Sequence, residues 1–114
     1  MDEIKNKVIL LSSEGCSGED TELGFAILAT LLDSLKNRED RPRAIIFWNT
    51  AVKLLSEKSC LSRHLRKLEE EGVAILAGRL CVNELELADK LVVGRPATMD
   101  EILDVILHNE VISL

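Results

Sequence analysis

Short, uninterrupted apolar runs recur along the chain with helix-like segments between them, and this alternation constrains the fold more than any other feature. The runs cover residues 8–11, 43–49, 73–77, 90–94 and 110–114. A run without polar alternation is typical of a strand that is covered on both faces. Strands that alternate with helices need right-handed crossovers. We therefore predict an α/β fold, a three-layer α/β/α sandwich whose sheet of about five strands is mainly parallel and doubly wound, as in Rossmann-like or flavodoxin-like folds.

The predicted first helix covers residues 20–37, with Asp20 as its N-cap. An apolar residue recurs along it at every fourth position, and further apolar residues fill most of its remaining surface: Leu23, Ile27, Leu31 and Leu35, then Phe25, Ala26, Leu28, Ala29 and Leu32. A helix that is apolar nearly all round is usually buried on more than one side. One side is expected to face the sheet, and we predict that another subunit covers the second.

Two further helices have recognisable ends. Residues 60–71 form a helix with one apolar face, and Gly72 is expected to end it. Another helix begins at Thr98, because Thr98 and Glu101 have the spacing of a capping box, in which each side chain caps the backbone amide of the other residue.

Length, charge and cysteine content exclude several classes of protein. The chain has 114 residues, enough for one core, so residues 1–114 are expected to form a single domain. A net charge of -6, with only two Phe and one Trp, disfavours nucleic acid as a partner. The start of the chain lacks the features of a signal peptide, and no apolar stretch approaches a membrane span. Three widely spaced cysteines fit a reduced, cytoplasmic location and provide no CxxC pair for zinc, so no metal or other cofactor is expected.

In a parallel sheet, the loops that leave the carboxyl ends of the strands meet at one edge, where ligands usually bind. The first four of these loops bring polar or thiol-bearing residues to that edge: Ser12, Ser13 and Cys16; Asn49 and Thr50; Arg79 and Cys81; Arg95 and Thr98. The edge is therefore the expected place of the functional site.

Cys81 is the main candidate for chemistry at this edge. A cysteine attacks only as a thiolate, which a nearby cation or free helix amides stabilise. Arg79 precedes Cys81 by two residues, and a short helical turn is expected from Asn83 to Asp89, with its free amides pointing back towards the sulfur. The alternative interpretation of Cys81 is a small apolar side chain packed under a loop.

The other candidates carry weaker signals. Cys16 is a thiol of a ligand-binding loop, a partner thiol for Cys81 or, as is more common for a lone cysteine in a Ser/Gly loop, an incidental residue. Cys60 begins a helix, and packing is expected there rather than reactivity. His64 lies among basic residues on a face expected to be solvated, and His108 ends a helix. The loop GCSGED precedes a helix but lacks the GK[ST] of a P-loop, so nucleotide binding has little support.

Several segments, taken in order, cover nearly the whole chain: VILLSSE, ELG at 22–24, IIFWNTAVKLL, Ser59, EEEGVAIL and KLVVG. Their order and spacing resemble those of the DsrE-like sulfurtransferase family, and within it the DsrE-like domain of YedF selenium-metabolism proteins. Such domains have a CGxC motif after the third strand. This chain reads Gly78-Arg79-Leu80-Cys81 there and keeps only the second cysteine.

The resemblance implies that Cys81 carries sulfur as a persulfide, as a cysteine in this loop is taken to do in related proteins. It also implies a homo-oligomer, trimeric or hexameric. Some YedF proteins have a TusA-like sulfur-carrier module ahead of this domain, which is not found before the first strand here. A separate protein is therefore expected to donate or accept the sulfur.

The sequence thus leads to the hypothesis of a cytoplasmic sulfur-relay protein, a sulfurtransferase if it turns over, with Cys81 as its nucleophile. The residues expected to support it are Arg79, Asn83, Asn49, Ser13 and Cys16. Two alternatives stay open. One is a binding or assembly module of sulfur or selenium metabolism without turnover, which the missing first cysteine favours. The other is a small-molecule or anion-binding domain built around the first loop.

Overall fold

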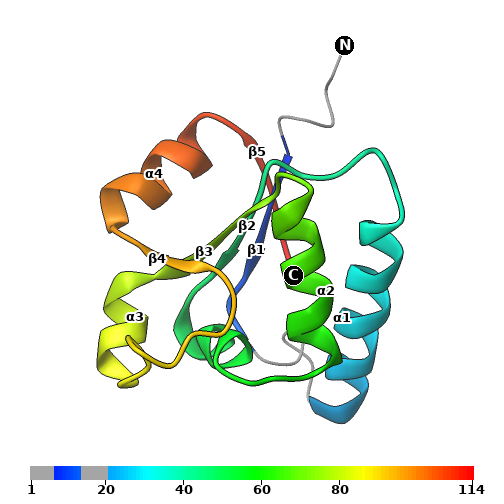
Figure 1. Ribbon diagram of the computed structural model, residues 1–114. Helices are drawn as coiled ribbons and strands as arrows, with labels where there is room; N and C mark the ends of the chain where they lie inside the picture. The colour runs from blue at the N-terminus through cyan, green and yellow to red at the C-terminus, as the bar shows by residue number, and fades with distance from the viewer. Residues whose placement is uncertain (1–6, 14–20) are drawn as a thin grey trace.

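The computed structural model describes residues 7–13 and 21–114, and these ranges contain a sheet of five parallel strands (Figure 1). The strands are β1 (Lys7–Leu11), β2 (Ala44–Phe47), β3 (Ala74–Gly78), β4 (Arg95–Ala97) and β5 (Glu110–Ser113). Their order across the sheet is β4-β3-β2-β1-β5, and every neighbouring pair is parallel. The predicted α/β fold is confirmed.

The two faces of the sheet pack against different helices. Leu11, Phe47 and Ile75 belong to a core shared with α1 (Thr21–Lys36), α2 (Cys60–Glu70) and the 3-10 helix η2 (Asn49–Leu55). The alternate strand residues, such as Val8 and Ile46, pack with α4 (Met99–Leu107) on the opposite face. Side chains alternate between faces along a strand, so uninterrupted apolar runs supply both cores. Figure 1 shows α1 and α2 on one side of the sheet and α4 on the other, which is the predicted three-layer arrangement.

Capping boxes fix the starts of α2 and α4. Thr98 Oγ1 accepts from the Glu101 amide at 3.2 Å, and Glu101 Oε1 accepts from the Thr98 amide at 3.1 Å, which confirms the predicted start of that helix. Ser59 and Ser62 form a second box before α2. The sequence motif does not reveal this second box, because its far member is a serine rather than the usual Glu or Gln.

Helix α1 is covered on two sides within one subunit. Its bounds agree with the predicted helix, although the predicted N-cap, Asp20, lies outside the described residues. Leu28 and Leu32 are buried in the core beneath the sheet, and α2 packs alongside α1. Helix α2 thus provides part of the cover that the sequence assigned to another subunit. Leu23 and Ile27 remain 57% and 49% exposed, and a subunit contact there stays a prediction.

The predicted strand at residues 90–94 is wrong. The chain is irregular there, and the short edge strand β4 begins only at Arg95. Val93 is nevertheless buried in the same core as α2, and the Val92 amide donates to the carbonyl of Leu55 at 2.8 Å. An apolar run indicates burial, but it does not distinguish a strand from a buried loop.

His64 lies between α1 and α2 rather than on a solvated face. Its side chain is 16% exposed, with Nδ1 at 3.1 Å from Lys36 Nζ and 3.9 Å from Asp33 Oδ1. The Lys36 ammonium can only donate, so Nδ1 of a neutral ring is the acceptor. Burial, and then the charge of Lys36, lower the pKa of His64 below its usual value, while Asp33 opposes this shift.

We expect the fold to lose stability as the pH falls through about 6.5, because His64 in the unfolded chain takes up a proton there while folded His64 resists it. The loss should level off once the pH is below the lowered pKa of the folded protein. His64→Gln should remove this part of the pH dependence. Urea denaturation of both proteins at several pH values between about 8 and 5 tests the prediction. Parallel pH profiles for the two proteins would contradict it.

Candidate functional site

Cys81 lies in the first turn of α3 (Arg79–Glu84), which starts directly at the end of β3. This places the thiol at the carboxyl edge of the sheet, where the sequence predicts it. The predicted helical turn from Asn83 to Asp89 is wrong, because the helix begins before the cysteine and ends at Glu84. The thiol is therefore part of a helix rather than of a loop ahead of one. Its side chain is half-buried and packs against the core on the α2 side of the sheet.

A backbone amide contacts the Cys81 sulfur. The amide of Asn49, at the carboxyl end of β2, donates a hydrogen bond to Cys81 Sγ at 3.1 Å. Asn49 has a φ of 55°, in the left-handed region that Asn tolerates better than most residues. An N–H group at this distance stabilises negative charge on sulfur. The structure thus brings together Asn49 and Cys81, through the backbone of Asn49.

Gly78 borders the same sulfur atom. A Cβ atom at this position would lie 3.5 Å from Cys81 Sγ and 3.2 Å from Trp48 Cβ. Position 78 corresponds to the first cysteine of the CGxC motif in the resemblance noted above. A thiol there would be within bonding reach of Cys81, but this chain has only a hydrogen atom in its place.

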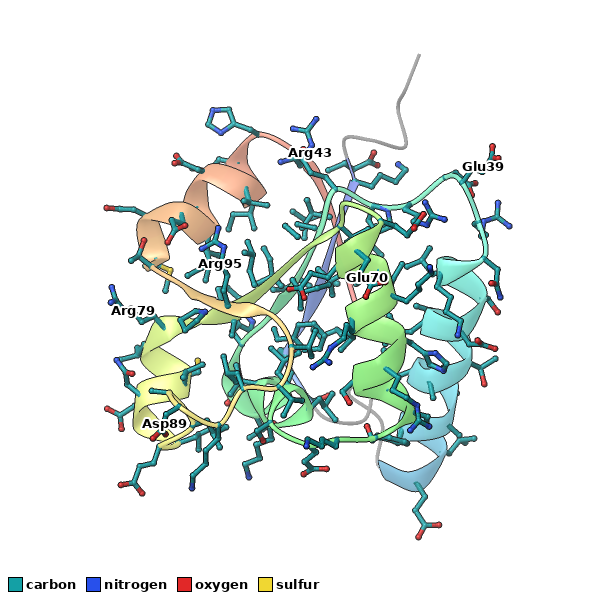
Figure 2. All side chains as sticks on the ribbon, in the orientation of Figure 1. Glu39, Arg43, Glu70, Arg79, Asp89 and Arg95 are labelled. Atoms are coloured by element: carbon teal, nitrogen blue, oxygen red, sulfur yellow. The ribbon has the colours of Figure 1, made fainter. Side chains whose placement is uncertain are left out.

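Arg79 lies apart from the sulfur. It lines a cavity of about 380 Å³ whose other lining residues are Asn83, Ala88, Pro96, Thr98 and Glu101. Figure 2 shows Arg79 on the outer side of α3. Residues two apart on a helix do not share a face, which separates Arg79 from Cys81. Among the described contacts, the predicted pairing of Arg79 with the sulfur is therefore absent, and Arg79 instead shares a cavity with Asn83 and Thr98.

Glu101, a carboxylate held by hydrogen bonds, is another lining residue of this cavity. Glu101 accepts from the Thr98 amide and also from Arg95 Nη1 at 3.0 Å. The Thr98 amide, and then Arg95, lower the pKa of Glu101, which keeps this side chain ionised. Arg95 is thus paired with Glu101 rather than directed to a ligand, while Arg79 gives the cavity its cation.

The remaining predicted residues lie elsewhere or outside the described ranges. Ser13 follows β1 at the same edge and is half-buried, whereas Cys16 lies outside the described residues. Cys60 is exposed at the first position of α2, which corrects the prediction that it is packed. At that helix start, Leu61 rather than Cys60 turns into the core.

The described residues fit neither the pattern of a metal site nor that of a membrane-spanning helix. Within residues 7–13 and 21–114, no three His, Cys, Asp or Glu side chains gather as metal ligands. Every helix in these ranges is too short or too polar to cross a membrane.

No protein-family model and no curated protein matches the chain, but three solved structures share its fold. A conserved protein of unknown function from Bacteroides thetaiotaomicron has a TM-score of 0.69 at 19% identity, over 100% of this chain and 99% of that protein. The ychN protein of E. coli has a TM-score of 0.65 at 14% identity, over 96% of this chain and 99% of that protein. A protein of unknown function from Methanobacterium thermoautotrophicum has a TM-score of 0.65 at 15% identity, over 95% of this chain and 97% of that protein.

Proposed function

We propose that this protein carries sulfur as a persulfide on Cys81, as one member of a sulfur relay of the DsrE-like kind. The hydrogen bond from the Asn49 amide to Cys81 Sγ carries the proposal, because it stabilises negative charge on the one atom that must act as nucleophile. The family resemblance extends the proposal to sulfur or selenium metabolism. A reduced, cytoplasmic setting would keep the thiol free for this role.

The step itself is an exchange between thiols and needs no outside oxidant. The Cys81 thiolate attacks the outer sulfur of a donor persulfide, so that a new S–S bond forms on Cys81 while the donor's S–S bond breaks and the donor leaves as a thiolate. The acceptor thiolate then removes the outer sulfur from Cys81 by the same exchange. Both steps conserve the number of S–S bonds, and Cys81 returns to its starting form.

Mass spectrometry after incubation with a cysteine desulfurase and cysteine tests the proposal. We expect the intact protein to gain one sulfur atom, the gain to map to the peptide that contains Cys81, and a reductant to remove it. Cys81→Ser should lower the loading at least about tenfold, because the nucleophile is gone. Cys60→Ser is the matched control, since Cys60 is more exposed but lies on another helix, and this variant should load like the original protein.

One alternative function has its own supporting observation. Cys81 is half-buried and packs against apolar side chains, as a cysteine of a binding or assembly module without turnover would. Under this alternative, neither the desulfurase nor polysulfide would load Cys81. Equal loading of the original protein and Cys81→Ser would also overturn the persulfide proposal.

A further inference from the structure

A second depression, with a positive lining, lies beside the start of α2. Its volume is about 350 Å³, and its lining residues are Lys58, Ser59, Ser62, Arg63, Arg66 and Val92. Three of these six side chains are cations and none is a carboxylate. The whole chain has a net charge of -6, so this lining differs in sign from the chain as a whole.

The cations of this depression are not neutralised by described neighbours. In residues 7–13 and 21–114, ion pairs form at several other basic residues but not at Lys58, Arg63 or Arg66. Arg66 donates through Nη2 to the carbonyl of Val92, which anchors one side of its guanidinium. A guanidinium has five N–H donors, so most of the Arg66 donors stay free for a ligand.

The start of α2 borders the depression, because Ser59 and Ser62 are among its lining residues. The Ser59–Ser62 capping box satisfies the amides of both serines, and the Arg63 amide bonds to the Ser59 carbonyl. The amides of Cys60 and Leu61, the first two residues of the helix, cannot find a carbonyl within the helix. The helix start therefore reinforces the positive potential that the three side chains create.

We propose that this depression binds a phosphate group, either as a free anion or as part of a small molecule. Arginine pairs with phosphate through two parallel hydrogen bonds, and lysine supplies a compact charge. Phosphate carries more negative charge than a carboxylate at neutral pH, which suits three cations in one depression. The site does not include Cys81, so it is independent of the persulfide proposal.

Calorimetric titration with pyrophosphate and with inorganic phosphate at low salt tests this site on the full chain. We expect saturable binding of one pyrophosphate, several-fold tighter than that of inorganic phosphate, because the additional charge engages more than one cation. Arg63→Gln should weaken pyrophosphate binding about tenfold, as expected for loss of one charge-assisted hydrogen bond. Lys58→Gln provides a second variant, and both replaced side chains are exposed, so the fold should tolerate each change.

Arg43→Gln is the matched control, because it removes the same charge from an exposed arginine outside the depression (Figure 2). It should change the affinity less than twofold, and Cys81→Ser should leave it unchanged. If Arg43→Gln and Arg63→Gln weaken binding equally, the anion is attracted by overall charge rather than held in this depression, and the proposed site is overturned. Absence of saturable binding to both anions would overturn it too. Binding of a polyglutamate peptide alone would replace it with an acidic protein partner.

Discussion

Gly94→Ala is expected to lower the free energy of unfolding by about 2–4 kcal/mol. Two penalties combine at this residue. Its φ of +79° lies in the left-handed region, which costs about 1–2 kcal/mol for a side chain such as alanine. The new Cβ would also lie 2.9 Å from Ile75 Cγ2 and 3.1 Å from the Ile75 carbonyl oxygen. Ile75 is buried in β3, which has a neighbouring strand on both sides, so neither atom can move away without disturbing the sheet.

Gly72→Ala separates the two penalties. Gly72 has a φ of +99°, but a Cβ there would meet no atom within 4 Å. This variant should therefore lose only the conformational part, about 1–2 kcal/mol. Urea denaturation of both variants and of the original protein gives the comparison. If Gly94→Ala costs no more than Gly72→Ala, the close approach to Ile75 has no energetic weight.

The sequence predicts most of the sheet because a strand that is buried on both faces is a continuous run of apolar residues. Strands β1, β2 and β3 are continuous apolar runs, and all three lie inside the sheet. Strand β4 is not such an apolar run. It has the sequence Arg95-Pro96-Ala97 at the edge of the sheet, where proline is tolerated, while the more apolar residues just before it pack as a loop. Apolar character thus indicates depth in the core, and tertiary context decides the local conformation.

At the candidate site, the sequence likewise predicts where residues lie in the fold but not which atoms contact each other. Topology alone places Cys81 and Asn49 at the carboxyl edge, because each follows a strand of a parallel sheet. The contact between them is made by the backbone amide of Asn49, so a search for polar or charged side chains near the thiol does not reveal it. Arg79 is the opposite case. Its closeness in sequence suggested a partner for the sulfur, yet a helix that starts at Arg79 turns the two side chains apart.

Gly78→Cys is expected to form a disulfide with Cys81 under mild oxidation and so to abolish sulfur loading. A Cβ at position 78 would lie 3.5 Å from Cys81 Sγ, so a sulfur attached to it can reach the Cys81 sulfur, and the two positions have the Cys-X-X-Cys spacing in which disulfides form. The 3.2 Å approach to Trp48 Cβ requires a shift of only a few tenths of an ångström. Once both sulfurs are bonded, Cys81 has no thiol left to react and cannot attack a persulfide. Intact mass spectrometry should show the loss of two hydrogens and, after desulfurase treatment, no added sulfur until the protein is reduced.

Gly78→Ser is the control for this experiment, because it adds the same Cβ and a side chain of similar shape without a thiol. It should load at a level close to that of the original protein, which would assign the block to the disulfide rather than to crowding by the new side chain. Loading of oxidised Gly78→Cys at the original level would show that sulfur enters without the Cys81 thiolate. The hydrogen bond from Asn49 would then have to be explained as a packing contact. Loss of loading in both variants would instead mean that open space beside Gly78 is what the incoming persulfide needs.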